Sequence, residues 1–133
     1  MSRLAVALIA LLLATAAAGC AGSTSSSSKF QGAERDVATA IDDLSSAGSR
    51  KNEAKICDEL LTKQLADSLK STGTDCETEI SDAIADSDDY DMTVKDVSVS
   101  GPTATAVVEN NDKTSTFRLQ KVGNAWRISS FGS

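Results

Sequence analysis

Apolar residues between positions 30 and 85 recur at steps of three and four, the period of an amphipathic helix. The first stripe predicts a helix that starts near residue 30 and ends near Gly48, with Phe30, Ala33, Val37, Ile41 and Leu44 on its apolar face. A second stripe contains Ile56, Leu60, Leu61, Leu65 and Leu69. Thr62 is a candidate helix cap that would divide the second stripe into two helices.

A third helix is expected to start at Thr74, because Glu77 follows three residues later as in a capping box. Its apolar face would contain Cys76, Ile80 and Ala83.

After Asp91 apolar and polar positions alternate, which is the period of a half-buried strand. Two-residue turns at 101–102, 111–112 and 123–124 would join four strands into an antiparallel meander. The resulting registers pair Leu119 with Ile128 and Phe117 with Ser130. They place one apolar set on a single face: Val97, Val99, Ala104, Ala106, Phe117, Leu119, Trp126 and Ile128. Pro102 is disfavoured at the second position of common turns, so a longer loop is the alternative for the first hairpin.

The opposite face of the predicted sheet is polar and contains Ser98, Thr105, Arg118, Gln120, Arg127 and Ser129. A sheet with one apolar face buries that face. Helices followed by such a sheet predict an α+β fold, with N-terminal helices packed on a curved, mainly antiparallel four-stranded sheet. Arg118 and Arg127 are expected on a solvated outer face. The alternative is a docking patch for an acidic partner or a cell-wall polymer.

The N-terminal residues 1–19 have the layout of an export signal. Arg3 supplies the positive charge, and residues 4–18 are apolar apart from one threonine. A membrane-spanning helix needs roughly 20 apolar residues, and this run is shorter. We therefore predict a cleaved signal peptide rather than a transmembrane helix.

The residues Ala17-Ala18-Gly19-Cys20 that end this signal resemble a bacterial lipobox. The resemblance implies that a diacylglyceryl group is attached to Cys20 and that the signal is cut just before it. The protein would then be anchored at the extracytoplasmic face of the bacterial cell membrane, because two acyl chains hold a protein where one binds only marginally. Ordinary cleavage at a small-residue site, with Cys20 as a free thiol, is the alternative.

A serine-rich segment, residues 20–29, follows the signal and is predicted to be a flexible tether, with a glycosylated stalk as the alternative. The remaining residues, 30–133, have the length of a single α+β domain. The formal net charge is −6. Removing Arg3, the only charged residue of the signal, makes it −7. An acidic domain is a poor partner for nucleic acid.

The domain contains four distinctive stretches: CDELLT at 57–62, a second cysteine at 76, VSVSGPTATAVV at 97–108 and TFRLQKVGNAWRIS at 116–129. Together they resemble actinobacterial lipoproteins of the nuclear-transport-factor-two-like (ketosteroid-isomerase-like, cystatin-like) superfamily. The resemblance implies a curved sheet that wraps around helices to form a cone. Members include isomerases, cyclases, dehydratases, transport adaptors and many non-enzymes, so the fold alone says little about activity.

Cys57 and Cys76 remain as a pair once Cys20 is assigned to the anchor. Outside the cytoplasm a disulfide between them is the expected state. Two buried thiols or a metal pair are the alternatives, but two cysteines without a histidine cannot complete a tetrahedral zinc site.

The absence of histidine restricts the catalytic chemistry. It excludes Ser-His-Asp and Cys-His nucleophile systems and the Asp-His pairs of dehydratase-type relatives. Isomerase-type relatives use a carboxylate base and a hydroxyl donor in an apolar cone. The only tyrosine, Tyr90, lies in an acidic loop, and the core-facing strand positions contain no carboxylate. We therefore predict a protein that is not an enzyme and needs no cofactor.

The acidic loop contains Asp86, Asp88, Asp89 and Asp91. Calcium prefers several oxygen ligands, but the loop has Asp91 where the calcium-binding pattern has glycine, and Val97 where it has glutamate. A solvated acidic loop without metal is therefore expected.

The small residues Ala104 and Ala106 could leave a pocket between sheet and helices. Its lining would consist of Ala104, Ala106, Phe117, Leu119, Trp126 and Ile128. A filled core is the alternative. The sequence thus predicts a monomeric, lipid-anchored, non-catalytic binding or interaction module for an unknown protein or small ligand. The alternatives are a carrier of a small hydrophobic ligand and a lyase or isomerase.

Overall fold

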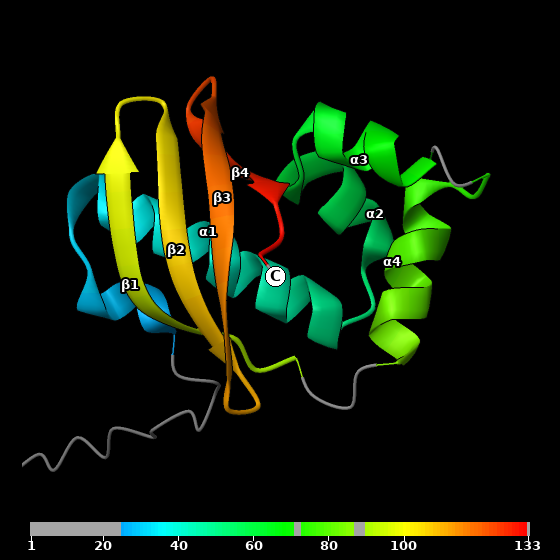
Figure 1. Cartoon of the computed structure of the whole chain (residues 1–133), viewed down its shortest axis with the longest axis horizontal. Coiled ribbons are helices and arrows are strands. Elements are labelled where there is room, and N and C mark those ends of the chain that lie inside the picture. The colour runs from blue at the N-terminus through cyan, green and yellow to red at the C-terminus, as the bar shows by residue number, and fades with distance from the viewer. Residues whose placement is uncertain (1–24, 71–72, 87–89, 133) are drawn as a thin grey trace, which may run out of the picture.

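The computed structural model describes residues 25–70, 73–86 and 90–132. The predicted signal peptide (1–19), Cys20, Asp88 and Asp89 lie outside the described residues. The fold is α+β, as predicted: four helices pack against an open, four-stranded antiparallel sheet (Figure 1). Within the described ranges, no helix is both long enough and apolar enough to cross a membrane.

The longest helix, α1 (Gly32–Ser49), lies across one face of the sheet (Figure 1). Its buried face contains Val37, Ala38, Ala40, Ile41, Leu44, Ala47 and Gly48, whereas Ala33 is exposed. The helix ends at Ser49, one residue past Gly48 and close to the predicted end, so Gly48 lies in its last turn. A Cβ atom at this position would lie 2.5 Å from Cδ1 of Tyr90, so glycine allows the tyrosine ring to pack directly on the helix backbone.

The second apolar stripe forms three short elements: α2 (Glu53–Lys55), the π-helical turn η2 (Ile56–Leu60) and α3 (Lys63–Lys70). Thr62 caps α3 as predicted, since its Oγ1 accepts a hydrogen bond from the Leu65 amide at 3.2 Å. The helical path is therefore interrupted at residues 61–62. This interruption brings residues 61–62 beside the sheet.

The last helix, α4 (Cys76–Ala85), begins one residue later than a cap at Thr74 would place it. Asp75 is the N-cap, and its carboxylate accepts a hydrogen bond from the Thr78 amide at 2.8 Å. Ile84 rather than Ala83 is buried with Cys76 and Ile80, since these three residues are spaced four apart on one face of the helix.

The sheet is a meander of β1 (Thr93–Ser100), β2 (Thr103–Asn110), β3 (Lys113–Val122) and β4 (Ala125–Ser130). The apolar positions predicted to pair do so: Val97 with Ala106, Ala106 with Phe117, and Leu119 with Ile128. Ser130 pairs with Arg118 rather than Phe117, because an extra residue, Ser129, shifts the register of β4. A second shift at Lys95 turns Val94 into the core.

All three hairpins have two-residue turns, so the longer loop considered for Pro102 does not form. Gly101 has a φ of 57°. A positive φ at the first central position, followed by the restricted φ of proline, suits a type II′ turn. Asn111 and Asp112 both have positive φ, 48° and 61°, which is the pattern of a type I′ turn.

Each edge strand of the sheet is contacted by another part of the chain. The Ser26 hydroxyl accepts a hydrogen bond from the Val94 amide of β1 at 3.0 Å. At the other edge, the Thr62 amide donates to the carbonyl of Ile128 at 2.8 Å, and Leu61 forms a parallel bridge with Ile128. These contacts satisfy backbone groups at one place on each edge strand.

The Ser26 contact changes the predicted boundary between tether and domain. Ser26–Lys29 form a short 3-10 helix, η1, in which Ser26 is only 2% exposed. The Asp42 carboxylate of α1 accepts hydrogen bonds from the Ser26 and Ser27 amides at 3.1 and 2.9 Å. Residues 25–29, predicted as part of the tether at 20–29, therefore belong to the folded unit, because Asp42 satisfies their backbone donors.

The two arginines expected on the outer face of the sheet have different surroundings. Arg118 is exposed, as predicted. Arg127 reaches around the edge strand, and its Nη1 donates to the carbonyl oxygens of Asp58 at 2.8 Å and Leu61 at 3.3 Å. Arg127 therefore satisfies carbonyl groups at the end of η2 and does not form a solvated face, so that prediction is wrong for this residue.

The arginine pair allows a stability test. We expect Arg127→Ala to lower the free energy of unfolding by about 1.5–3 kcal/mol, because it removes a charged donor from two carbonyl groups. Arg118→Ala should change it by no more than about 0.5 kcal/mol. Equilibrium denaturation measures both, and equal effects of the two substitutions would contradict the assigned role of Arg127.

Candidate functional site

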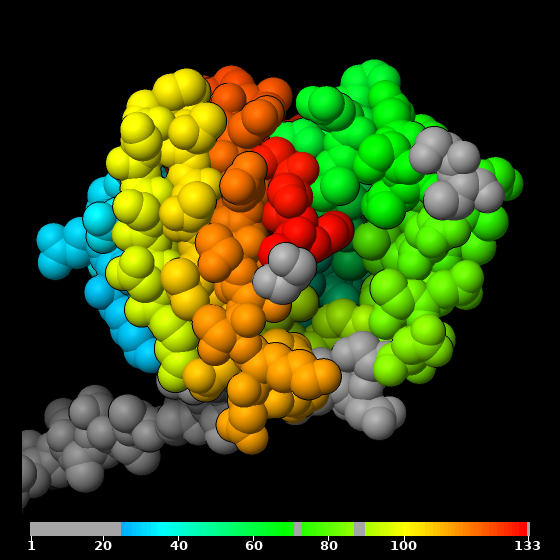
Figure 2. Space-filling model, in the orientation of Figure 1, coloured from blue at the N-terminus to red at the C-terminus, as the bar shows by residue number. Residues whose placement is uncertain are grey.

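An apolar cleft of about 200 Å³ lies at the end of the core where α1, α4 and the C-terminal residues meet. In Figure 2 this region appears as a hollow between the C-terminal strand and α4, with α1 at its base. The lining residues are Leu44, Gly48, Ile56, Ile80, Ala83, Ile84, Tyr90, Met92 and Phe131. Eight of these nine carry no polar side-chain group other than a thioether, so the cleft favours apolar groups.

Tyr90 is held at the cleft by hydrogen bonds to two helices. Its hydroxyl donates to the carbonyl oxygen of Ala83 on α4 at 3.1 Å. The hydroxyl of Ser45 on α1 donates to the carbonyl oxygen of Tyr90 and accepts from the Met92 amide at 3.4 Å. With its ring packed on Gly48, Tyr90 therefore connects α1 to α4 and fixes one side of the cleft.

Phe131 forms the opposite side and is 38% exposed, which is unusual for a large apolar side chain. Its ring contacts Phe117 edge-on, with ring centroids 5.5 Å apart and an interplanar angle of 80°. Phe117 is itself buried in the core. The core therefore orients Phe131 while one side of its ring remains accessible at the cleft.

The six residues predicted to line a pocket are all buried in the core: Ala104, Ala106, Phe117, Leu119, Trp126 and Ile128 are each at most 8% exposed. Ala104 and Leu119 also border a groove on the other face of the sheet, and Trp126 borders a surface pocket beside Leu60. None of the six lines the apolar cleft. The indole Nε1 of Trp126 is buried and has no hydrogen-bond partner among the described residues. Because solvent cannot reach this atom, it is not placed to contact a ligand.

The cleft residues gave little signal in the sequence. Ile56, Leu44 and Ile80 were predicted as core residues, and Tyr90 as part of an acidic loop. The spacing of Gly48 and Tyr90 shows nothing of their contact, which joins residues 42 positions apart. Phe131, beyond the last strand, gave no signal either, because its exposure is visible only in the structure.

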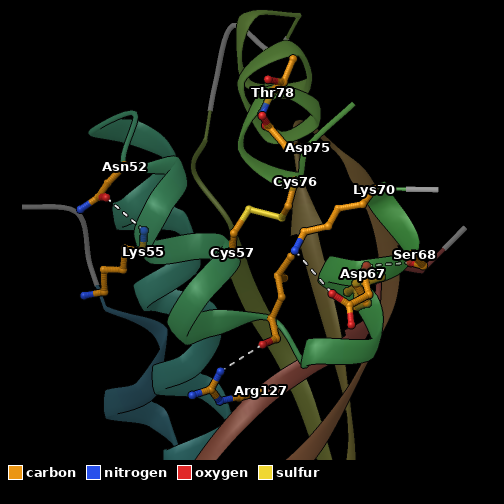
Figure 3. The surroundings of a disulfide bond; sticks show 12 residues. Asn52, Lys55, Cys57, Asp67, Ser68, Lys70, Asp75, Cys76, Thr78 and Arg127 are labelled. Carbon is orange, nitrogen blue, oxygen red and sulfur yellow. Dashed lines mark hydrogen bonds and ion pairs between the residues drawn. A yellow bond between two sulfur atoms is a disulfide. The ribbon is translucent and has the colours of Figure 1, made fainter. Parts of the chain in front are cut away.

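A disulfide joins Cys57 of η2 to Cys76 at the first turn of α4, with the two Cα atoms 6.1 Å apart (Figure 3). The pairing agrees with the sequence prediction. Since η2 and α4 contribute Ile56, Ile80, Ala83 and Ile84 to the cleft, this bond connects two of the elements that line it. It limits how far α4 can move away from the core.

Charged residues surround the disulfide and line a groove of about 610 Å³. Hydrogen bonds from Lys63, and more weakly Lys70 at 3.5 Å, hold the pKa of Asp67 below its usual value. The Thr78 amide lowers the pKa of Asp75 in the same way. Acids and bases are mixed here, so the groove presents no field of one sign.

Metal binding has no structural support within the described residues. No group of three or more potential metal ligands occurs in residues 25–70, 73–86 and 90–132. Two members of the acidic loop, Asp88 and Asp89, lie outside these ranges.

Comparison of the chain with protein families, with curated proteins and with solved structures found no match.

The role of the disulfide can be tested by reduction or by the Cys57→Ser/Cys76→Ser double variant. We expect the free energy of unfolding to fall by about 3 kcal/mol, since the bond closes a loop with a sequence separation of 19. Hydrogen exchange should increase more in α4 than in β2 and β3, which the bond does not touch. A uniform increase across helix and sheet would show that the bond does not specifically retain α4.

Proposed function

We propose that this protein is a lipid-anchored, extracytoplasmic, non-catalytic binding module whose binding site is the apolar cleft. The observation that carries the proposal is the cleft itself: it opens to the surface beside the core and is lined almost entirely by apolar side chains. Solvent-exposed apolar surface is costly to maintain, and its concentration at one concave place is typical of binding sites.

The size of the cleft limits the occupant. A cavity of about 150 Å³ lined by similar side chains binds benzene, and the cleft is about 200 Å³. It therefore suits one aromatic ring or a short branched aliphatic group, from a partner's side chain or a small ligand. A larger ligand would place only one such group inside.

The lining supports binding rather than catalysis. General acid–base chemistry needs a group that can exchange a proton near neutral pH. Tyr90 supplies the only ionisable side chain among the nine lining residues, and its hydroxyl already donates to a backbone carbonyl. A base and an acid that act together are not available in this lining.

We further propose that the domain belongs to the nuclear-transport-factor-two-like superfamily that its sequence resembles. Support comes from helices packed on one face of an antiparallel sheet and from the placement of the cysteine pair. The binding cleft would then lie at one end of the layer between helices and sheet.

The proposed anchor would hold the domain near the membrane. Cys20 and Ser25 are five residues apart, and a fully extended chain spans at most about 3.3–3.6 Å per residue. The distance between them is therefore at most about 18 Å. The Ser25 hydroxyl donates to Asp42 at 2.8 Å. The segment from Cys20 to Ser25 would therefore join the domain at a fixed place on α1.

The anchor is tested with Cys20→Ala. In a bacterial host we expect the wild-type protein in the membrane fraction and the variant outside it, because the variant lacks the sulfur that carries the diacylglyceryl group. Mass spectrometry of the N-terminal peptide should show the lipid on the wild type alone. A wild-type peptide without lipid would overturn the proposed anchor.

Binding at the cleft is tested with two alanine-to-leucine variants of α4. Ala83 lines the cleft and Ala85 does not, although both are exposed. With toluene as the probe, methyl NMR signals of Ile80 and Ile84 should shift saturably. Ala83→Leu should weaken binding at least tenfold by filling the cleft, whereas Ala85→Leu should leave it unchanged. Unsaturable shifts, or equal effects of the two variants, would refute the assignment of the cleft.

A further inference from the structure

The open face of the sheet, opposite the helices, carries a polar groove of about 470 Å³. It is lined by Ser98, Ser100, Thr103, Ala104, Thr105, Arg118, Leu119, Gln120 and Ser129. Five of these residues carry hydroxyl groups, one carries an amide, and Arg118 is the only charged residue. This composition differs from the mixed charges around the disulfide and from the apolar cleft.

The strand registers bring these side chains together in two rows. Ser98 pairs with Thr105, which pairs with Arg118. In the neighbouring row, Thr103 pairs with both Ser100 and Gln120. Adjacent strands are about 4.8 Å apart, so hydroxyl groups from three strands lie within reach of one small ligand beside the guanidinium.

The register shift in β4 adds a further hydroxyl. Ser130 lies opposite Arg118 and Ile128 opposite Leu119, which leaves Ser129 as the extra residue. Ser129 is half-buried and lines the groove. Bulges often redirect a side chain at functional sites, and here the bulge adds a donor next to Arg118.

Arg118 is available for a ligand. It is exposed, and its side chain has no hydrogen bond or ion pair with any residue that the structure describes. Arg127, its expected companion on this face, is turned to the carbonyl groups of Asp58 and Leu61. Thr103 already donates to the Ser100 carbonyl at 3.0 Å. The remaining donors are the guanidinium, the Gln120 amide and the other hydroxyl groups.

We propose that this groove binds the phosphate group of a soluble phosphomonoester, with Arg118 as its charged anchor. A guanidinium pairs with two oxygens of a phosphate at once, and hydroxyl donors on both sides can reach the third. Carboxylates, which would repel the ligand, are missing from the lining. The groove is on the opposite side of the sheet from the apolar cleft. The proposal for the groove does not depend on the function proposed for the cleft.

The charge of the ligand favours a phosphomonoester over other anions. It carries about −1.5 to −2 at pH 7 and offers three acceptor oxygens. A carboxylate or a sulfate ester carries one negative charge, so its attraction to a single guanidinium is weaker. The protein as a whole is acidic, with a formal charge of −6, so the repulsion also grows with the charge of the ligand, and the close contact with Arg118 has to outweigh it.

The test uses the full chain in a neutral detergent, with sn-glycerol 3-phosphate as the probe and NMR as the readout. We expect saturable shifts at the amides of Ser98, Thr105, Arg118 and Ser129. Arg118→Gln should weaken binding at least tenfold, and Thr105→Val about threefold, because it removes one hydroxyl group without changing the shape of the residue. Glycerol alone should produce no shift.

Lys121→Gln is the matched control, because it removes one positive charge from the same strand at an exposed position outside the groove. It should weaken binding less than twofold. Binding should also weaken several-fold from pH 7.5 to pH 5, since the phosphate loses charge below its second pKa of about 6 while arginine stays protonated.

Three results would overturn the proposal. They are the absence of saturable shifts, equal losses from Arg118→Gln and Lys121→Gln, and equal binding of acetate and the phosphate probe. An unchanged thermal unfolding curve for Arg118→Gln is required for its binding loss to support the proposal. If this variant is unstable, Thr105→Val decides, and unchanged binding by Thr105→Val would then overturn it.

Discussion

The fold depends on the burial of a single face of the antiparallel sheet. Ile128, Leu119 and Ala106 lie in adjacent strands and are almost completely buried against the helical layer. Because side chains alternate along a strand, this burial also fixes which face the remaining side chains of the sheet occupy, except at the bulges of Lys95 and Ser129. It also leaves the second face without a covering helix (Figure 1). The polar groove around Arg118 lies on that face.

The elements outside the sheet share one hydrophobic core with it, and a few specific contacts fix them further. Arg127 donates hydrogen bonds to the carbonyl groups of Asp58 and Leu61 at η2. The disulfide joins α4 to η2 (Figure 3). At the opposite edge, Asp42 binds the amides of the N-terminal segment. The contacts between the helices and the sheet are thus reinforced at both sheet edges, where backbone groups would otherwise be exposed.

The apolar cleft and the polar groove arise from this arrangement in different ways. The cleft forms where α4 lies beyond the β4 edge of the sheet (Figure 1) and Phe131 and Tyr90 only partly close the core. The groove forms on regular strands, and one bulge adds Ser129 to it. One surface therefore offers apolar contact and the other hydrogen bonds with a single positive charge. Ligands of opposite chemistry can bind at the two places without competing.

The sequence by itself determined the strands, their turns and the buried face. Alternation and turn residues are local signals, and they correctly placed Trp126, Phe117 and Val97 in the core. Only the tertiary structure decided where Arg127 goes, because strand parity gives a face but not the reach of a long side chain around an edge. It also decided the contact of Gly48 with Tyr90, the burial of Ser26 and the shifts at Lys95 and Ser129. These features depend on contacts between residues that are distant in the chain. The candidate cleft depends on such contacts as well. The helical periodicity identified apolar residues, but it could not show which of them would lie at an incompletely filled end of the core.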